Sequence, residues 1–368
     1  MRYTREDGCR AWLTYGLIRS DVMTSLLSEY GNAEAMYDRF TRQGSSFLEK
    51  RISETSISYL REHAAPDVMH QMMVAMKQHQ MGVLCPEDTL YPDSLRDIQS
   101  PPAILFYRGD PDCLMGKCIA VVGSRSASPR ALEDTRRICR DLSNAGVTIV
   151  SGFAMGIDTA AHEGCLDGSS PTAAVLSTGL DVDYPVDNAP LKDLIVRRGG
   201  VLLSEYPPGM HASRHVFSVR NRIMSGLSKA VLMMESKIQS GSMLTVQHAL
   251  DQGREVFAYP GIPGSDWAEG AHQLLREGAS YFTSAEDVLE DLGWLGDAPM
   301  PTPQQKKELP AMSESQRKVF TLLGQGELSF DQLAAQSGLS APELTIALTM
   351  LQMLGLIKPM PGKTYCKA

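Results

Sequence analysis

The chain has 368 residues and a formal net charge of −8, with 43% hydrophobic and 21% charged residues. This composition is that of an ordinary globular protein of two or three domains, and its acidity argues against a protein that coats nucleic acid non-specifically. No stretch approaches the roughly 20 apolar residues that cross a bilayer, and the first seven residues lack the apolar run of a signal peptide. Seven cysteines without a C-x-x-C pair are typical of reduced thiols. We expect a cytoplasmic protein without membrane insertion, metal or cofactor.

Residues 1–80 show helical patterns only. Short amphipathic segments cover residues 12–18, 22–27 and 33–40 and are interrupted at Gly31 and Gly44. These patterns predict a small helical domain over residues 1–80.

Residues 81–297 alternate short apolar runs with helical stretches such as 131–145 and 244–252. This alternation predicts an α/β fold with a doubly wound, mostly parallel sheet and helices on both faces. Ligands of such sheets bind at the carboxyl ends of the strands. The predicted strands are 119–122, 147–150, 172–176, 200–203, 230–234 and 255–258.

Residues 298–312 contain four prolines and predict a semi-rigid linker. Three helices and a hairpin follow within residues 313–368, which predicts a winged-helix domain. The third helix, beginning at Ala341, contains no Arg or Lys and has Glu343 near its start. Because a helix that reads DNA needs donors for phosphates and bases, this favours protein contact or a structural role.

A cationic segment stands out in this acidic chain. Residues 211–237 carry five basic side chains and one acidic one, a local charge of +4. Such a segment predicts a site for an anion, in particular a phosphate chain. Near its centre, Phe217 lies close to Arg220, Asn221 and Arg222, an arrangement that suits a nucleic-acid strand: the ring stacks on a base while the cations hold phosphates. The alternative is an arginine–carboxylate network, for which Glu235 is the acidic residue available nearby.

Two predicted strands end in a glycine-bearing turn that leads into a helix. Gly123, Ser124 and Arg125 come first, and Ser128-Pro129 then opens a helix whose free N–H groups would face an anion. A plain turn with a surface arginine fits this pattern equally well. Ser240-Gly241-Ser242 repeats the design after the strand at 230–234. Together with the arginines, the two helix starts predict a phosphate site at one edge of the sheet.

Asp158 and His162 lie on one face of a predicted helix, after a turn containing Gly152 and Gly156. They could form an acid–base pair. A capping carboxylate beside a structural histidine is the commoner arrangement, and we favour it. The glycines let the backbone approach a ligand closely.

Taken in chain order, these stretches resemble the DNA-processing protein A family (DprA, also called Smf). The resemblance covers roughly residues 90–280. The segments that carry it are Leu90-Tyr91-Pro92, Val122-Gly123-Ser124-Arg125, Ser151-Gly152, Gly156-Ile157-Asp158, Gly179-Leu180-Asp181, Ser204-Glu205-Tyr206-Pro207, Arg220-Asn221-Arg222, Ser240-Gly241-Ser242 and Gly253-Arg254-Glu255.

The resemblance implies a SAM-like helical domain over 1–80, a Rossmann-like core over 81–297 and a DprA winged-helix domain over 313–368. It also implies a homodimer that binds single-stranded DNA, protects incoming DNA and loads the RecA recombinase onto it in natural transformation, together with other competence proteins. The residues expected to bind DNA are Ser124, Arg125, Gly152, Phe217, Arg220, Asn221, Arg222, Lys237, Gly241, Ser242 and Arg254.

The chain departs from the family pattern at two places. Met155 stands where family members have an arginine, so we expect weaker DNA binding or a larger share of it at Arg214 and Lys237. The segment Gly270-Ala271-His272 also differs from the usual sequence.

A different function compatible with such a sheet is a nucleotide-processing enzyme of the phosphoribohydrolase type. That group resembles Pro-Gly-Gly-x-Gly-Thr followed by Glu, where this chain has residues 240–247. Gln247 replaces the glutamate, and an amide cannot serve as a general base. We therefore expect a binding protein without catalytic residues rather than an enzyme.

Overall fold

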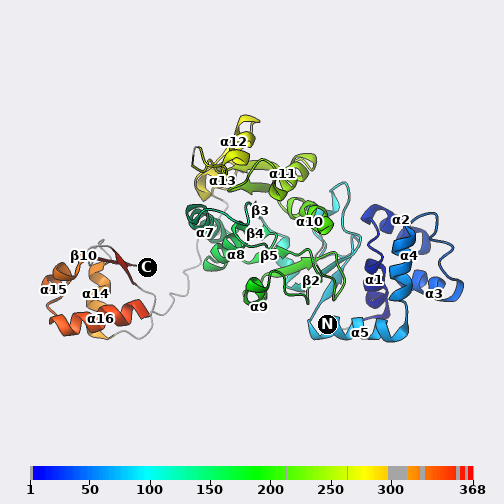
Figure 1. Ribbon diagram of the computed structural model, residues 1–368, viewed down its shortest axis with the longest axis horizontal. Coiled ribbons are helices and arrows are strands. Elements are labelled where there is room, and N and C mark those ends of the chain that lie inside the picture. Colours follow the sequence, from blue (N-terminus) through cyan, green and yellow to red (C-terminus); the bar gives the residue numbers. More distant parts are fainter. Residues whose placement is uncertain are drawn as a thin grey trace. The chain divides into compact units, whose positions relative to one another are not determined.

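The computed structural model describes residues 3–211, 214–262, 264–296, 313–323, 328–353, 357–360 and 364–367. The chain divides into two compact units, Met1–Pro301 and Thr302–Ala368 (Figure 1). Among the described residues, no helix is long and apolar enough to cross a membrane.

The first unit begins with a helical region around the buried side chain of Trp12. Its indole Nε1 donates to the Leu60 carbonyl at 2.9 Å, and its ring meets Tyr37 and Phe40 edge-on. Each such fully buried aromatic side chain contributes roughly 1.5–3 kcal/mol through burial. The region is helical as predicted, while its SAM-like nature and its limit at residue 80 stay predictions. The helices are α1 (Arg5–Tyr15), α2 (Ser20–Tyr30), α3 (Ala33–Gln43), α4 (Glu54–Glu62) and α5 (Pro66–Gln78).

The centre of the first unit is a sheet with the strand order β1-β2-β6-β5-β4-β3-β7-β8-β9. All neighbours from β6 to β9 in this order run parallel, whereas β2 pairs antiparallel with both β1 and β6. The six predicted strands correspond to β3–β8, so the predicted fold class is confirmed. The bounds are β1 (Gly82–Leu84), β2 (Leu105–Gly109), β3 (Cys118–Val122), β4 (Thr148–Ser151), β5 (Thr172–Val175), β6 (Val201–Ser204), β7 (Ala230–Met233), β8 (Glu255–Ala258) and β9 (Ser280–Tyr281).

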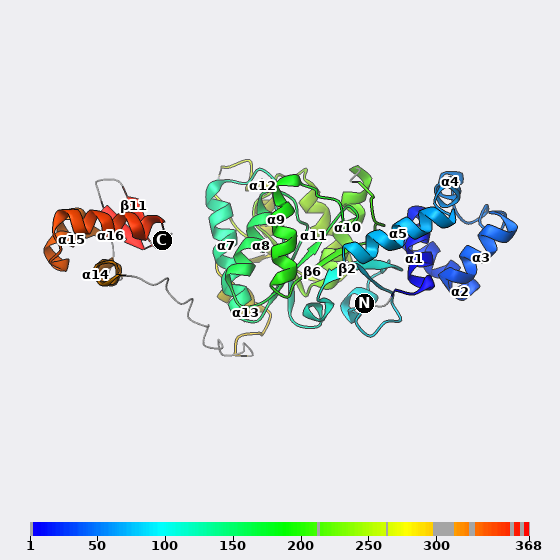
Figure 2. The same ribbon diagram turned by 90° about the horizontal axis from the view of Figure 1, so that it is seen from below.

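Helices cover both faces of this sheet (Figures 1 and 2). Ala120 and Val122 pack on the side of α10 and α11, whereas Ile119 and Val121 pack on the side of α7 and α8. This alternation follows from the two-residue period of a strand. The helices are α6 (Asp93–Arg96), α7 (Pro129–Asn144), α8 (Ile157–Asp167), α9 (Ala189–Arg197), α10 (Arg214–Leu227), α11 (Gly241–Asp251), α12 (Glu269–Arg276) and α13 (Ala285–Asp291), with 3₁₀ turns at Pro111–Leu114 and Val186–Asn188.

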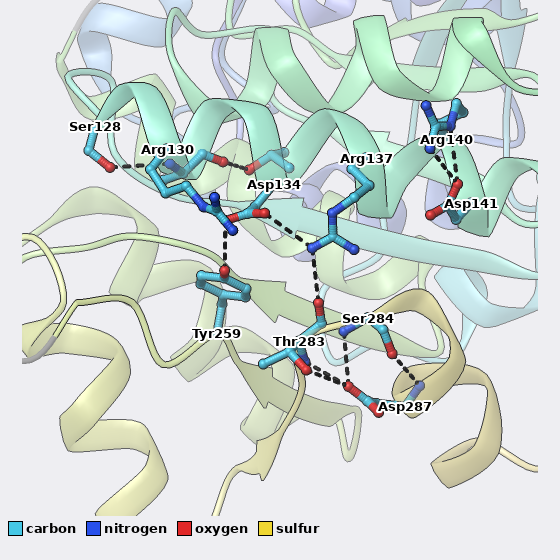
Figure 3. A network of polar contacts seen from close by, with 12 residues as sticks. Ser128, Arg130, Asp134, Arg137, Arg140, Asp141, Tyr259, Thr283, Ser284 and Asp287 are labelled. Carbon is cyan, nitrogen blue, oxygen red and sulfur yellow. Dashed lines mark hydrogen bonds and ion pairs between the residues drawn. The ribbon is translucent and has the colours of Figure 1, made fainter. Parts of the chain in front are cut away.

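A polar network around the buried Asp134 fastens α7 to the far end of the sheet (Figure 3). The carboxylate accepts hydrogen bonds from Tyr259 Oη at 2.7 Å, Arg130 Nε at 2.7 Å and Arg137 Nη2 at 3.1 Å. Arg137 also donates to the Thr283 carbonyl. Burial favours the neutral acid, but these three donors outweigh it and hold the pKa of Asp134 below its usual range. The network therefore keeps a charged carboxylate inside the fold.

The second unit has the predicted three helices and hairpin. Val319, Leu333, Leu344 and Leu351 form its core. The linker predicted over 298–312 and the hairpin tip at 361–363 lie outside the described residues. The elements are α14 (Glu314–Leu322), α15 (Phe330–Ser337), α16 (Ala341–Met353) and a sheet of β10 (Leu328–Ser329), β12 (Thr364–Lys367) and β11 (Ile357–Met360) in that order.

Candidate nucleic-acid interface

A pocket of about 280 Å³ opens at the carboxyl ends of β3 and β7. We call it the edge pocket. It brings together seven of the predicted DNA-binding residues, from the β3 turn, from α10 and from the segment entering α11: Ser124, Arg125, Arg220, Asn221, Lys237, Gly241 and Ser242.

The floor of the edge pocket contains a buried cation, Arg220. Its Nε donates to Ser177 Oγ at 3.3 Å, and its guanidinium lies so close to Gly152 that a Cβ there would be 1.8 Å from Nη1. Burial lowers the pKa of Arg220 to about 10, although the nearby Asp158 carboxylate acts in the opposite direction. A phosphate entering the pocket would supply negative charge to this poorly solvated guanidinium.

The start of α11 forms another wall of the pocket. The hydroxyls of Ser236, Ser240 and Ser242 are mutually within 2.5–3.1 Å. Asn221 Nδ2 donates to the Gly241 carbonyl at 3.0 Å and so fixes α10 against this turn. The first turn of α11, whose residues are all described, contains no acidic side chain. The positive end of the helix dipole therefore faces the pocket, and no acidic side chain of this first turn neutralises it.

Thr245, on the next turn of α11, adds a buried hydroxyl to the lining of the edge pocket. Among the described residues its Oγ1 has no hydrogen-bond partner. A buried hydroxyl without a partner is costly, and a bound anion could accept a hydrogen bond from it.

Trp267 also lines the pocket, although it was not among the residues predicted from the sequence. Lys237 Nζ lies 4.6 Å from the centroid of its ring. A cation over an aromatic face beside an anion site is an arrangement that suits both a phosphate and a base. Trp267 lies in a loop outside the cationic segment, so only its position in space connects it with the site.

The helix start of α7 differs from the prediction. Ser128 is the N-cap and Pro129 the first residue, as expected. However, the Glu235 carboxylate accepts hydrogen bonds from Ser128 N at 2.8 Å and Ser128 Oγ at 2.7 Å. The anion at this helix start is therefore a side chain of the protein itself, and the expectation of an open anion site here is corrected.

Arg222 lies outside the edge pocket. Its guanidinium forms a bidentate pair with Glu205, with both N–O distances at 2.7 Å, and Nη2 also donates to Ser20 Oγ at 3.0 Å. It lines a separate cavity of about 680 Å³. The arginine–carboxylate network considered from the sequence thus exists for Arg222, with Glu205 rather than Glu235 as the partner.

Arg254 is another predicted residue that does not line the edge pocket. Its Nη2 donates to the carbonyls of Ser94 at 2.7 Å and Gly226 at 3.1 Å, which is a structural contact between loops and helices. The side chains of Phe217 and Arg214 lie outside the described residues, although their backbones belong to α10.

A small adjoining hollow of about 60 Å³ lies at the ends of β4 and β5. Gly152 lines it, together with Arg125, Tyr184 and Met155. Met155, where the resemblance led us to expect an arginine, is 39% exposed. An arginine at position 155 would therefore place its charge near Arg125, in the small hollow rather than in the edge pocket.

His162 has the contacts of a structural residue. It is fully buried, and its Nδ1 lies 2.7 Å from Thr172 Oγ1. Burial, assisted by the positive charge of Arg220, lowers the pKa of His162 to about 3. Asp158 accepts a hydrogen bond from Ala154 N at 3.2 Å at the start of α8. Both contacts agree with the structural interpretation that we favoured over an acid–base pair.

The family of the chain follows from comparison with known proteins. The family model described as "DNA recombination-mediator protein A" matches residues 82–293, which is more than half of the chain. The chain belongs to this family, the DNA-processing protein A family. The DprA winged helix domain model matches residues 298–363. The family predicted from the sequence motifs is therefore confirmed.

Relatives of this DprA-family chain include the protein Smf of Escherichia coli K12, with 38% identity over 288 residues and 76% coverage of each chain. The DNA processing protein DprA of Streptococcus pneumoniae is 43% identical over 204 residues, covering 55% of this chain and 72% of the relative.

Solved structures of family members share the fold. The X-ray structure of DprA from S. pneumoniae has a TM-score of 0.62 at 32% identity and covers 79% of this chain and 99% of that one. The DprA structure from Helicobacter pylori is described as giving insights into a single-stranded DNA binding mode. It has a TM-score of 0.53 at 27% identity, and the match covers 60% of this chain and 98% of that one.

Proposed function

We propose that this protein binds single-stranded DNA in the edge pocket, protects it and loads RecA onto it in natural transformation. It acts as a homodimer, with other competence proteins, and turns over no substrate. The observation that carries the DNA-binding part is the convergence of Arg220, Lys237 and the open start of α11 on one pocket. The single-stranded DNA binding named for the H. pylori relative supports the same choice of ligand.

The pocket favours a single strand over a duplex for a physical reason. Phosphates are held by the two cations and by the N–H groups of α11. Trp267 supplies an aromatic face, and stacking on it requires a base whose own face is not covered by a neighbouring pair. A duplex offers phosphates but few accessible base faces.

A nucleotide-processing enzyme is the second candidate, because the Asp158 carboxylate also lines the edge pocket. Gln247, at the position of the catalytic glutamate in the phosphoribohydrolase group, instead donates to Asp251 at 2.9 Å on the exposed side of α11. Hydrolysis of a nucleoside monophosphate by the purified protein, abolished by Asp158→Asn, would favour the enzyme.

The DNA-binding proposal is tested by anisotropy titration of a labelled oligothymidine and of a duplex of equal length over a series of salt concentrations. We expect tight, salt-sensitive binding of the single strand and weak binding of the duplex. The salt slope is the slope of the logarithm of the binding constant against the logarithm of the salt concentration. Lys237→Ala should reduce its magnitude by roughly 0.7, because one phosphate contact is lost. Arg197→Ala, an exposed cation on α9, is the matched control. Equal affinity for both DNAs, or unchanged binding by Lys237→Ala, would overturn the proposal.

The RecA and dimer parts need separate measurements. We expect the protein to shorten the lag before RecA hydrolyses ATP on single-stranded DNA covered by a single-strand-binding protein. Light scattering should give twice the mass of one chain. An unchanged lag or a monomeric mass would remove the corresponding part of the proposal.

A further inference from the structure

A cavity lined by aromatic side chains lies where the helical region meets the loop after β6. Its volume is about 410 Å³, and none of its lining residues lines the edge pocket. We call it the aromatic cavity. Three aromatic side chains face an apolar loop segment across it, and its lining consists of Tyr15, Leu17, Tyr59, His63, Pro208, Gly209 and Met210.

Two of the three aromatic rings, those of Tyr15 and His63, are held in place by contacts within the protein. Tyr15 and His63 stack with their centroids 3.9 Å apart and an angle of 14° between the planes. Tyr15 Oη donates to the Pro208 carbonyl at 2.7 Å, and His63 Nδ1 lies 2.8 Å from the Tyr59 carbonyl. Rigid aromatic faces opposite an apolar loop suit a planar, aromatic ligand, and little side-chain entropy is lost when one binds.

Two lining residues are exposed although they are large and apolar or aromatic. Tyr59 is 42% and Leu17 48% exposed. Leu17 also has a φ of 47°, a left-handed backbone conformation that is rare for leucine. Strained backbone conformations of this kind cluster at active sites and ligand clamps.

The sheet topology places this cavity on the same edge as the edge pocket. The strands between them follow the order β7-β3-β4-β5-β6, and all of them are parallel. The edge pocket lies at β7 and β3, the small hollow with Gly152 at β4 and β5, and the loop with Met210 beyond β6. With about 4.8 Å between strands, the path from β7 to β6 measures about 19 Å, which a few nucleotides of an extended strand can cover.

The charges near the cavity favour a base over a phosphate. Asp181 accepts hydrogen bonds from Gly209 N at 2.8 and 3.0 Å, so a carboxylate lies beside the loop. Asp183 nearby pairs with Lys192. A phosphate would be repelled by the Asp181 charge, whereas a neutral base would not.

We propose that the aromatic cavity is a second DNA subsite, where the helical region stacks an unpaired base of the same strand that the edge pocket holds. The proposal rests on the proposed function, since the edge pocket must hold the strand first. It gives the helical region a direct part in DNA binding and extends the bound length of the strand beyond the edge pocket.

The test is a length series of oligothymidines titrated against wild type and Tyr59→Ala. Wild type should gain affinity once the strand is long enough to reach the cavity. Tyr59→Ala should lose that gain, roughly five-fold or more, while binding the shortest oligonucleotide normally. Its salt slope should stay unchanged, because no phosphate contact is lost. Tyr59→Phe keeps the ring and should behave as wild type.

Tyr281→Ala is the matched control, because Tyr281 is 57% exposed on β9 at the opposite end of the sheet. Wild-type binding by Tyr59→Ala at every length would overturn the proposal. An equal loss at all lengths would also overturn it, since that result indicates damage to the edge pocket. If wild type binds no single strand of any length, the proposed function itself fails, and the two failures are thus distinguished.

Photo-crosslinking provides a readout that does not depend on affinity. An oligothymidine with one terminal 5-iododeoxyuridine should crosslink to a peptide containing Tyr59 or His63 from one end only. Crosslinks confined to edge-pocket peptides from both ends would contradict the proposal.

Discussion

Arg222 and Glu205 form a bidentate ion pair that also binds Ser20 of the helical region. The two residues before Arg222 make different contacts: Arg220 reaches Ser177 at the end of β5, and Asn221 reaches Gly241 at the start of α11. Three consecutive side chains therefore fasten α10 to three different parts of the first unit. Arg220 and Asn221 line the edge pocket, while Arg222 has a structural role.

The first prediction concerns Arg222→Ala. The change leaves the Glu205 carboxylate, which is largely buried, without its cation, so urea unfolding should show a loss of about 3 kcal/mol. The salt slope of DNA binding should stay that of wild type, because no phosphate contact is removed. Replacing both partners, Arg222→Met with Glu205→Met, should recover much of the stability. A reduced salt slope with normal stability would instead indicate that Arg222 contacts phosphate.

The second prediction concerns Gly152→Ala. The added Cβ would lie 1.8 Å from Arg220 Nη1, so the guanidinium must leave its place. We expect single-stranded DNA to bind at least several-fold more weakly, with a salt slope smaller by roughly 0.7. Gly116→Ala is the control, since a Cβ there meets no atom within 4 Å. Equal DNA binding by both variants would show that Arg220 does not hold a phosphate.

The third prediction concerns Thr245→Val, which removes a buried hydroxyl without changing the shape of the side chain. Because Oγ1 has no partner among the described residues, the free energy of unfolding should stay constant or increase. DNA affinity should fall by about 1.5 kcal/mol, roughly ten-fold, through the loss of a hydrogen bond to a charged group. Thr178→Val removes another buried hydroxyl that has no partner within the described part of the chain and that does not line the edge pocket, so it should leave affinity unchanged.

The fourth prediction concerns pH. The pKa of His162 is about 3 in the folded chain and 6.5 as its ordinary value, so the unfolded chain takes up the proton first. Above pH 6.5 this residue does not lower the free energy of unfolding. As the pH falls from 6.5 toward 3, the free energy of unfolding decreases by about 1.4 kcal/mol per pH unit. Urea unfolding at pH 7 and pH 5 should show this loss in wild type and a smaller one in His162→Gln. His70→Gln, an exposed position on α5, should retain the wild-type dependence.

The fold was predictable from the sequence because its signals are local. Apolar runs such as 119–122 and 230–234 occur where β3 and β7 form, and Ser128-Pro129 marks the start of α7. The strands β1, β2 and β9 were not predicted. The strands β1 and β9 are short and lie at the two edges of the sheet, and the pairing of β2 with β6 joins residues about a hundred positions apart. Sequence periodicity contains no information about such a partner.

The candidate site was predictable in part. Seven of the eleven predicted DNA-binding residues line one pocket, because parallel strands bring their carboxyl ends to one edge. Arg222 and Arg254 could not be excluded in advance, since the atoms that bind them, in Glu205 and in the carbonyls of Ser94 and Gly226, are chosen by tertiary packing. Trp267 was missed for the same reason.

The sequence by itself determined the family, the parallel sheet and the cationic character of residues 211–237. Only the tertiary structure decided which charges are available to a ligand. Glu235 lies 107 positions from Ser128 and fills the start of α7, while Glu205 neutralises Arg222. The physical reason is that a charge acts over a few ångströms in space whatever its distance along the chain. The first turn of α11 contains no acidic side chain, and the nearby Asp158 offsets the charge of the buried Arg220 only in part. Both features line the edge pocket, which is why it is the candidate site for DNA.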